Sequence, residues 1–448
     1  MQTSDYLEQL VQDRDDLVTN LTTQGITGLT GDETFTELVP QVLDIPTVPI
    51  EVEEKDVNFY DYDGTIVNSY TKDEFLALEE LPENPTHEGL IAQGWNWTLS
   101  DAQTQMTYFD KLDIGQAYIT DDNSTRIYIT LNEDILKLYV GFAVNGTVTI
   151  DWGDNTTPST VTGNDTSTVI NTQHTYSQAG NYVISISGEN TIYIIGQDTK
   201  SYLLNGGIIN NEYISNAYLS CINKIELGNM FFAYQGGGNL GYCVSLKYIT
   251  IPKELEFSGR SSLFYNCVSL KHLNISRLTR SMYAKFANNC SSLEIISLPK
   301  TIGEFYDNVF YNCFSLKRIT GGNPNTPVIL RNYAFYSCNK LKNIYFNFNL
   351  NQFSKQFSNT ISLLSLKISN QTTSFSGQLF ENSGVLFVDF TSYTVIPTLS
   401  NTYLTFPKYC SIIVPDNLYD DWIVATNWTT YASQIISESD WNTLQNNE

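Results

Sequence analysis

Between residues 240 and 390, apolar and polar positions recur with a fixed period. Five copies of a short phrase place an aromatic residue, a cysteine and a leucine in the same order, with the cysteines 24, 23, 23 and 25 residues apart. These cysteines are Cys243, Cys267, Cys290, Cys313 and Cys338. Two degenerate copies follow at 357–363 and 380–386. The period predicts a solenoid, because each unit is too small to bury its own apolar face and neighbouring units must share one core.

The phrase also predicts which side chains face solvent. We expect its Phe, Cys, Leu and Ile positions to point inward, whereas Tyr265, Tyr311 and Tyr336 each follow a core Phe and alternate outward. A row of Tyr and Asn is suited to binding sugars or protein epitopes, because Tyr gives a large contact area at low entropic cost. The alternative is that these tyrosines cover the edge of the core.

The repeated cysteines allow two interpretations. Adjacent coils of a solenoid lie about 5 Å apart, which is within the Cα range of a disulfide, so a disulfide ladder or a metal cluster is one reading. The side chains would, however, project side by side instead of facing one another. We therefore expect the cysteines to serve as small buried hydrophobic residues of the repeat core.

The first 45 residues carry a helical pattern. Residues 5–24 place apolar side chains from Leu7 to Leu21 at the spacing of a short heptad seam. We expect 1–45 to attach the chain to a partner or to drive its self-association, with the alternative that the helix docks on its own chain. A linker that two prolines stiffen follows over 46–53.

The remaining chain divides by pattern into four segments. Residues 54–120 mix short strand and helix patterns and predict a small α+β module, in which Trp95 and Trp97 either stack on a sugar or fill a core. Residues 121–196 contain strand-length alternating runs between Gly, Asn and Asp turns, which predicts a β-sandwich. The solenoid and its cap then occupy 197–436, and 437–448 is a tail.

Charge separates the two halves of the chain. Residues 1–200 hold 33 acidic and 7 basic side chains, whereas 201–448 hold 15 and 17. The acidic half would repel nucleic acid and anionic membrane surfaces. No apolar run approaches the ~20 residues of a membrane span, and the N-terminus lacks the pattern of a signal peptide. We therefore expect neither nucleic-acid binding nor membrane insertion.

One motif suggests catalysis. The segment 57–65 resembles the first motif of haloacid dehalogenase-type phosphatases, which would make Asp61 the nucleophile and Asp63 the acid/base beside a magnesium ion. That family needs a doubly wound α/β domain larger than 54–120, and Asp-Tyr-Asp-Gly-Thr is equally a good hairpin turn. The three histidines fall in three different segments. We expect a protein that is not an enzyme and has no cofactor or metal.

The repeat phrase resembles the leucine-rich repeats of the BspA type, which occur in bacterial surface adhesins and in structural proteins of phages. The copy around Ala334 and Phe335 matches the pattern Ala-Phe-x-x-Cys-x-x-Leu-x-x-Ile completely. The segment 410–431 is similar to the family's C-terminal cap. In physical terms, a last strand and an amphipathic helix would close the open end of the core.

Two further segments carry resemblances. Asp151-Trp-Gly-Asp154, His174-Thr-Tyr176 and the run after Gly180 resemble the landmarks of PKD-like domains, which are spacers or adhesion modules. The segment 31–43 resembles the start of structural proteins that phages of gut bacteria encode.

Together these observations predict a multidomain, β-rich protein with short N-terminal helices, an α+β block, a PKD-like sandwich and a C-terminal solenoid. The function we expect is a virion structural protein on the exterior of a phage tail, fibre or other appendage, made in the bacterial cytoplasm without a signal peptide. Its N-terminal region would contact other virion proteins or form a homo-oligomer, a trimer or other multimer. Segments 54–120 and 121–196 would form a stalk, and the repeats at its end would bind a host surface glycan or protein. The alternatives are a bacterial surface adhesin and a purely architectural virion protein.

Overall fold

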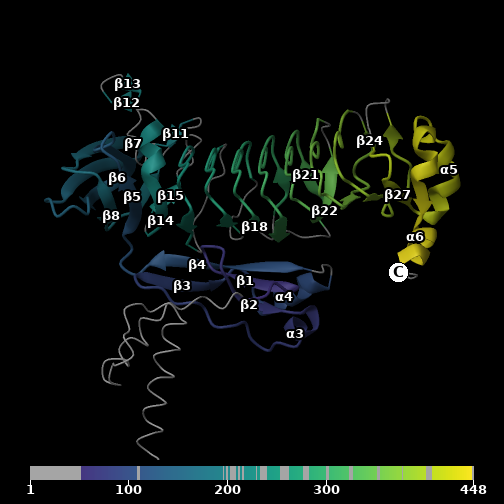
Figure 1. The fold of residues 1–448 in the computed structure, drawn as a ribbon, viewed down its shortest axis with the longest axis horizontal. Helices are drawn as coiled ribbons and strands as arrows, with labels where there is room; N and C mark the ends of the chain where they lie inside the picture. The colour runs from purple at the N-terminus through teal and green to yellow at the C-terminus, as the bar shows by residue number, and fades with distance from the viewer. Residues whose placement is uncertain are drawn as a thin grey trace, which may run out of the picture. The chain divides into compact units, whose positions relative to one another are not determined.

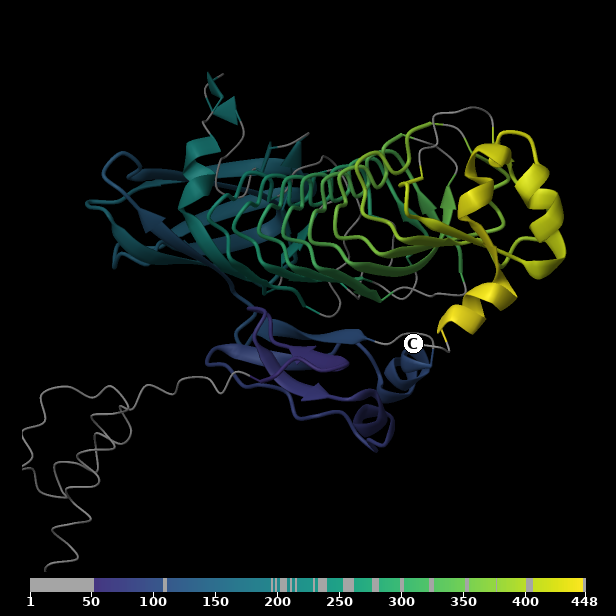
Figure 2. The ribbon, with the colours of Figure 1, turned by 45° about the vertical axis from the view of Figure 1, so that its right-hand side comes forward.

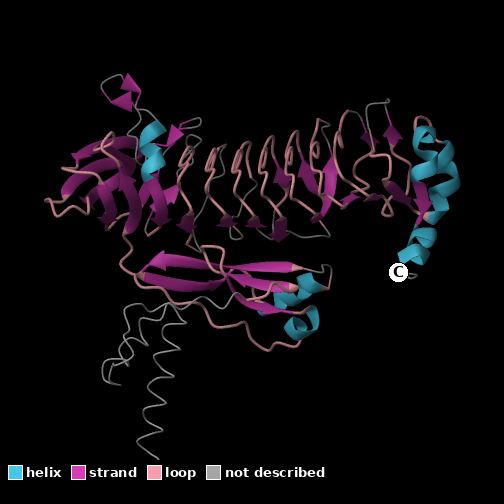
Figure 3. Ribbon diagram, viewed as in Figure 1, coloured by secondary structure: helices cyan, strands magenta, loops and turns pink. Residues whose placement is uncertain are grey.

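The structure is a computed structural model that describes residues 52–445 with gaps (Figure 1). The gaps are 108–110, 195, 198–199, 202–207, 210–211, 214–215, 229, 233–239, 253–261, 276–281, 299–301, 322–325, 351–353, 376 and 400–405. The predicted helix over 5–24 and its heptad positions therefore lie outside the described residues. Strands predominate over helices (Figure 3), which confirms the predicted β-rich class. Among the described helices, none has the length and apolar character needed to cross a membrane.

Residues 54–120 form a mixed four-stranded sheet in the order β2-β1-β4-β3 with two short helices. The elements are β1 (Val57–Tyr60), β2 (Ile66–Tyr70), α3 (Lys72–Leu76), β3 (Leu90–Trp95), α4 (Leu99–Met106) and β4 (Leu112–Thr120). A tight turn over Asp61–Thr65, with Gly64 at φ +88°, joins β1 to β2. A capping box between Thr71 and Glu74 starts α3. Only β1 and β4 run parallel, so this is not a doubly wound α/β domain.

Apolar side chains from both helices and the sheet close the core of this α+β module. Phe59 packs edge-on against Trp95 with ring centroids 4.8 Å apart. Both Trp95 and Trp97 are buried, at 5% and 6% exposure. The two tryptophans therefore fill a core and offer no open sugar platform.

Residues 125–194 contribute five strands to an eight-stranded sheet, and the start of the repeat region contributes the other three. Its members are β5 (Thr125–Leu131), β6 (Lys137–Asp151), β7 (Ser159–Thr175), β8 (Gly180–Gly188), β9 (Ile192–Ile194), β14 (Ile222–Glu226), β15 (Met230–Phe232) and β16 (Tyr248–Thr250). Strand β14 pairs antiparallel with β5 and parallel with β16. One hydrophobic core runs without interruption from these strands into the solenoid, so the sheet closes the first turn of the array.

The three aromatic landmarks of the 121–196 segment meet in space. Trp152 is fully buried and stacks on His174 with ring centroids 4.8 Å apart. The His174 ring lies 2.7 Å from an Asp154 carboxylate oxygen, measured from Nε2 to Oδ2. The Tyr176 hydroxyl donates to the Trp152 carbonyl at 3.0 Å, and Asn155 adopts φ +63° in the turn between them. These contacts tie the β6 end to β7.

The solenoid stacks its turns through a parallel sheet with one strand per turn (Figure 2). The strands are β17 (His272–Asn274), β18 (Ile295–Leu298), β20 (Arg318–Gly321), β22 (Asn343–Leu350), β23 (Ser365–Ile368), β25 (Phe387–Asp389), β27 (Ser411–Val414) and β28 (Ile435–Ser437). Shorter strands are β19 (Glu304–Phe305), β21 (Val328–Leu330), β24 (Ser374–Phe375) and β26 (Thr398–Leu399). The main strands keep register, so His272, Ile295 and Arg318 lie side by side.

A second ladder links the turn segments that precede each cysteine. In one turn the backbone N–H groups of Lys285, Ala287 and Asn289 donate to carbonyls of the next turn at 2.9, 2.9 and 2.7 Å. Lys285 and Asn289 have φ of +59° and +62°, and the same two positions are left-handed in the turns of Cys267, Cys313 and Cys338. The left-handed residues turn alternate N–H groups toward the following turn. Asn recurs at the second position because it tolerates this conformation.

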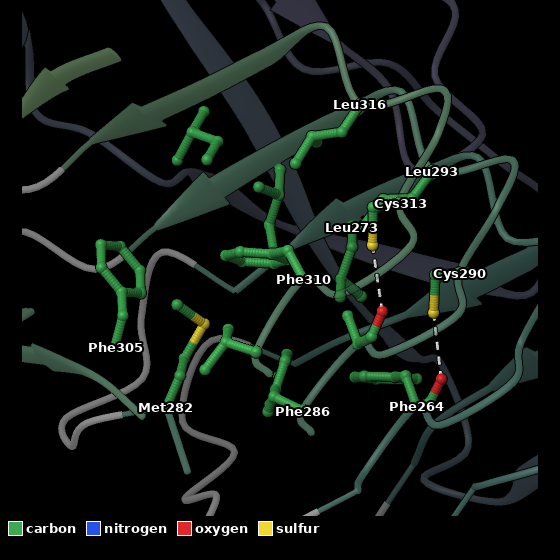
Figure 4. Close-up of a cluster of buried hydrophobic side chains, with 14 of the residues drawn as sticks. Phe264, Leu273, Met282, Phe286, Cys290, Leu293, Phe305, Phe310, Cys313 and Leu316 are labelled. Carbon is green, nitrogen blue, oxygen red and sulfur yellow. Dashed lines mark hydrogen bonds between the residues drawn. The ribbon is translucent and has the colours of Figure 1, made fainter. Parts of the chain in front are cut away.

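The repeat cysteines are fully buried, and the thiols of four of them donate to backbone carbonyls of the preceding turn (Figure 4), those of Cys267, Cys290, Cys313 and Cys338. Cys290 Sγ lies 3.0 Å from the Phe264 oxygen, and Cys313 Sγ lies 3.1 Å from the Ala287 oxygen. Burial raises the pKa of Cys290 to about 12. All seven cysteines of the chain are free thiols. Besides filling volume, each of these four thiols shares its carbonyl acceptor with the backbone N–H of the preceding repeat cysteine.

The last turns end in a helical cap. Its elements are α5 (Tyr419–Val424), β28 and α6 (Glu438–Gln445), the last in a segment for which the sequence predicts only a tail. Trp422 and Trp428 are buried against the final turns, and Trp428 Nε1 donates to the Pro397 carbonyl at 2.8 Å. The cap thus covers the apolar end of the array.

Candidate binding surface

The solenoid has two outward faces, and the α+β module covers part of the one that the sheet forms. Arg318 on β20 donates from Nε to Asp113 Oδ2 at 2.8 Å and from Nη2 to the Tyr60 hydroxyl at 2.6 Å. It also pairs with Glu54. The Asp113 side chain is fully buried, so the module is pinned to the solenoid by a charge pair that is shielded from water.

The pKa values of this pair follow from burial and from mutual attraction. Burial alone would lower the pKa of Arg318, but the Asp113 carboxylate and its neighbours raise it above its ordinary value. Burial raises the pKa of Asp113 by more than Arg318 lowers it. The charged form of each buried group is therefore stabilised by the other.

Four further contacts extend this docked sheet face. Tyr60 stacks on His272 with ring centroids 5.3 Å apart, and Asn274 Nδ2 donates to the Gln116 carbonyl at 3.1 Å. Lys224 Nζ donates to the Tyr62 hydroxyl at 3.1 Å, and the Tyr62 ring packs edge-on against Tyr248. These contacts correct the expectation that 54–120 belongs to a stalk, because the module packs beside the repeats.

The opposite edge of each turn, which we call the turn face, carries the predicted tyrosines, all partly exposed. Tyr311 and Tyr336 stack with ring centroids 4.8 Å apart and an interplanar angle of 7°. Tyr265 instead contacts Tyr242, with ring centroids at 5.3 Å. Asn288 takes the tyrosine position in the intervening turn, where Ala287 stands at the position that Phe holds in the neighbouring copies. The structure thus joins two of the three predicted residues.

Other aromatic residues of the turn face are absent from the predicted set. Tyr333 packs edge-on against both Tyr311 and Tyr336. Tyr283 stacks on Tyr306 at 5.0 Å, and the Arg331 guanidinium lies 4.6 Å from the Tyr306 ring centre. Tyr283, Tyr306 and Arg331 each precede their cysteine by seven residues. That spacing was the available signal, and it falls outside the short phrase that defines the repeats.

A column of asparagines follows the tyrosines at the position one residue before the cysteine, with Ser337 in place of Asn in the turn of Cys338. Asn289 Nδ2 donates to Asn266 Oδ1 at 2.9 Å, and Asn312 Nδ2 donates to Asn289 Oδ1 at 3.0 Å. Asn382 continues the pattern toward Asn359 at 3.3 Å. An amide has two N–H donors and two acceptor lone pairs, so an inner member of this column keeps one of each for a ligand.

Four charged side chains of the turn face form two ion pairs, and Lys285 and Asp307 add one charge of each sign. Arg331 pairs with Glu304, and Lys355 Nζ lies 2.9 Å from Glu381 Oε2. The hydrogen bond to Glu304 is the main cause that raises the pKa of Arg331. The surface therefore presents aromatic rings and amides with little net charge.

Asp61 and Asp63, the residues of the phosphatase-like motif, lie in the β1–β2 turn. The buried Asp61 carboxylate accepts from the Tyr118 hydroxyl at 2.9 Å and lies 2.7 Å from His87 Nε2. Asp63 accepts from the backbone N–H of Thr65 at 2.9 Å. Both carboxylates thus hold the hairpin. Among the described residues, no group of three or more His, Cys, Asp or Glu is placed to hold a metal ion.

Comparison with protein families gives six matching copies of the BspA type leucine rich repeat region, over residues 236–328 and 260–386. The predicted BspA-type repeats are thereby confirmed for about a third of the chain. A crystal structure of a leucine rich cell surface protein from Faecalibacterium prausnitzii A2-165 is similar, with 18% identity and a TM-score of 0.22. The match covers 41% of this chain and 49% of that protein. No curated protein matches the sequence.

Proposed function

We propose that this chain, whose residues 236–386 are BspA-type leucine-rich repeats, is a binding protein that attaches to the envelope of a host cell through its turn face. The observation that best supports this proposal is the difference between the two faces of the array. The sheet face is occupied by the α+β module through Arg318 and His272, whereas the turn face presents stacked tyrosines and an amide column. Attachment by many weak contacts along a rigid array requires no catalysis.

We place this activity on a phage tail, fibre or other exterior appendage. The segment 31–43 carries the resemblance to phage structural proteins, and 1–45 would bind other virion proteins or form a homo-oligomer. Several copies on one particle would multiply weak contacts into firm attachment. The 121–196 segment, with its PKD-like landmarks around Trp152, would act as a rigid spacer. A bacterial surface adhesin and a purely architectural virion protein are the alternatives.

The attachment is tested by labelling the full chain and measuring its binding to a panel of gut bacteria. We expect saturable binding to a subset of strains, and competition by the unlabelled protein. The full chain is needed because a cut near residue 197 would separate β14 from β5. Absence of binding to every strain would overturn the proposal and favour the architectural role.

The location on a virion needs its own measurement. Antibodies against the chain, coupled to gold, are expected to decorate the tails or fibres of phage particles by electron microscopy. Decoration of bacterial cell surfaces without phage would overturn the virion assignment in favour of the adhesin.

A further inference from the structure

We infer that the turn face binds an uncharged, extended polysaccharide with one sugar unit on each turn of the solenoid. The inference rests on the proposed attachment function and specifies its ligand. The binding surface comprises the Tyr311–Tyr333–Tyr336 cluster, the column of Tyr283, Tyr306 and Arg331, and the column of asparagines from Asn266 to Asn382.

The spacing of the surface selects the class of ligand. Equivalent rings on successive turns lie 4.8 Å apart for Tyr311 and Tyr336 and 5.0 Å apart for Tyr283 and Tyr306. This step is close to the length of one hexose unit in an extended polysaccharide. An extended peptide advances only ~3.3 Å per residue, so a peptide along the array would lose register within two turns. A polymer with one unit per turn can repeat the same contacts.

The chemistry of the surface suits hydroxyl groups. The hydroxyls of Tyr311, Tyr333 and Tyr336 make no hydrogen bond with another side chain or backbone group in the part of the chain that the structure describes. The neighbouring Asn289 amide uses one N–H and one lone pair within the column, and the Asn312 amide uses one N–H. What remains is a donor and an acceptor side by side, the pair that vicinal sugar hydroxyls require.

The charges select a neutral polymer. Arg331 and Lys355 are both engaged by carboxylates, those of Glu304 and Glu381. An anionic polysaccharide would have to displace these carboxylates to reach these two cations, which leaves only Lys285, and Asp307 of the following turn offsets its charge. A neutral chain leaves both pairs intact, and its ring C–H groups can pack on the tyrosine rings.

The ligand is tested with the full chain against neutral and acidic polysaccharides purified from a strain that it binds. We expect binding to a neutral polymer, with an affinity that rises with oligosaccharide length until the chain spans the turns of Tyr283 to Tyr336. The double change Tyr311→Ala and Tyr336→Ala should weaken binding about tenfold or more, since each aromatic contact contributes ~0.5–1.5 kcal/mol and 1.4 kcal/mol is tenfold. Tyr409→Ala is the matched control, because Tyr409 is 78% exposed and lies outside these columns.

Cell treatments separate this inference from the attachment function. Loss of cell binding after periodate oxidation of surface glycans, with binding retained after protease treatment, supports the polysaccharide. The reverse pattern overturns the polysaccharide while attachment itself stands. Unchanged affinity in the tyrosine double variant, with an unchanged unfolding midpoint, overturns the assignment to the turn face.

Discussion

The sheet face and the turn face belong to the same stacked turns but are built on different chemistry. Along the sheet face, one register position is occupied by Lys224, Tyr248, His272, Ile295 and Arg318 in successive strands. Each differs from its neighbours and meets its own partner on the α+β module or lies under it. Along the turn face, Asn and Tyr recur at fixed positions. A row of different side chains is complementary to a single folded surface, whereas a row of repeated side chains is complementary to a partner with a repeating structure.

The difference also lies in exposure. The docked sheet face buries a carboxylate and an imidazole, so its contacts are costly to interrupt. The turn face holds its side chains half-exposed, with charges paired at the surface, and its contacts contribute little to folding. Substitutions on the two faces should therefore separate stability from binding.

The largest effect is expected for Arg318→Met. The change leaves Asp113 buried without its cation, and removing one partner of a buried pair typically costs about 3–5 kcal/mol. Chemical denaturation would measure the loss as a lower unfolding midpoint. Lys317→Met is the matched control, because Lys317 pairs with Glu294 at an exposed site where such pairs contribute ~0–1 kcal/mol.

Addition of Asp113→Asn to Arg318→Met should recover part of the lost stability, because the buried charge is then removed. Equal losses for Arg318→Met and Lys317→Met would show that the module is not held by this pair, and the contrast between the faces would fail.

The next effect is a pH dependence at His272. Burial lowers its pKa from 6.5 to about 4, with Asp63 and Arg318 as the charged groups that act on it and Tyr60 stacked on its ring. The unfolded state therefore binds a proton more readily, and stability falls as the pH drops from 6.5 through 4. The loss approaches about 3 kcal/mol at 1.36 kcal/mol per pKa unit.

His272→Phe keeps the stacking on Tyr60 and removes the titration. As the pH is lowered from 7.5 to 4, the free energy of unfolding should decline less steeply in this variant than in the natural protein. Parallel pH curves for the two proteins would contradict the burial of an uncharged imidazole at the interface.

The smallest effect is expected on the turn face, at Asn312. Its φ of +60° costs ~1–2 kcal/mol for a residue with an ordinary Cβ, so Asn312→Ala should destabilise by about that amount. Asn312→Gly keeps the backbone conformation and removes only the amide contact to Asn289, so it should cost a few tenths of a kcal/mol. Comparable losses of stability in both variants would show that the loss comes from the amide contact and not from the left-handed backbone conformation.

The repeats were predictable from the sequence because the same buried apolar positions recur in each unit. The positions of Cys290, Phe310 and Leu316 follow from a period, and a period survives substitutions at any single site. The hydrogen bonds from the thiols were not predictable, because they depend on which carbonyl of the preceding turn lies within reach of each sulfur atom.

The docking of the α+β module was also beyond the sequence. Asp113 and Arg318 stand 205 residues apart; Asp113 lies in no motif, and Arg318 occupies a variable position of the repeat phrase. Their pairing depends on the surface shape of two finished folds. Tyr333 and Tyr283 were missed for a simpler reason, since they belong to the turns but precede the recurring phrase.

The one-directional ladder between turns has a consequence for how such a chain changes over generations. In every unit the equivalent N–H groups donate to the following turn. Inserting or deleting one unit of 23 to 25 residues therefore shifts all later turns by one position and leaves the hydrogen bonds between turns unchanged. The first turns are fixed by the docked module as far as β20, and the last are fixed by the cap. Length can therefore vary between β20 and the cap, where each added or lost unit would lengthen or shorten the turn face by one turn.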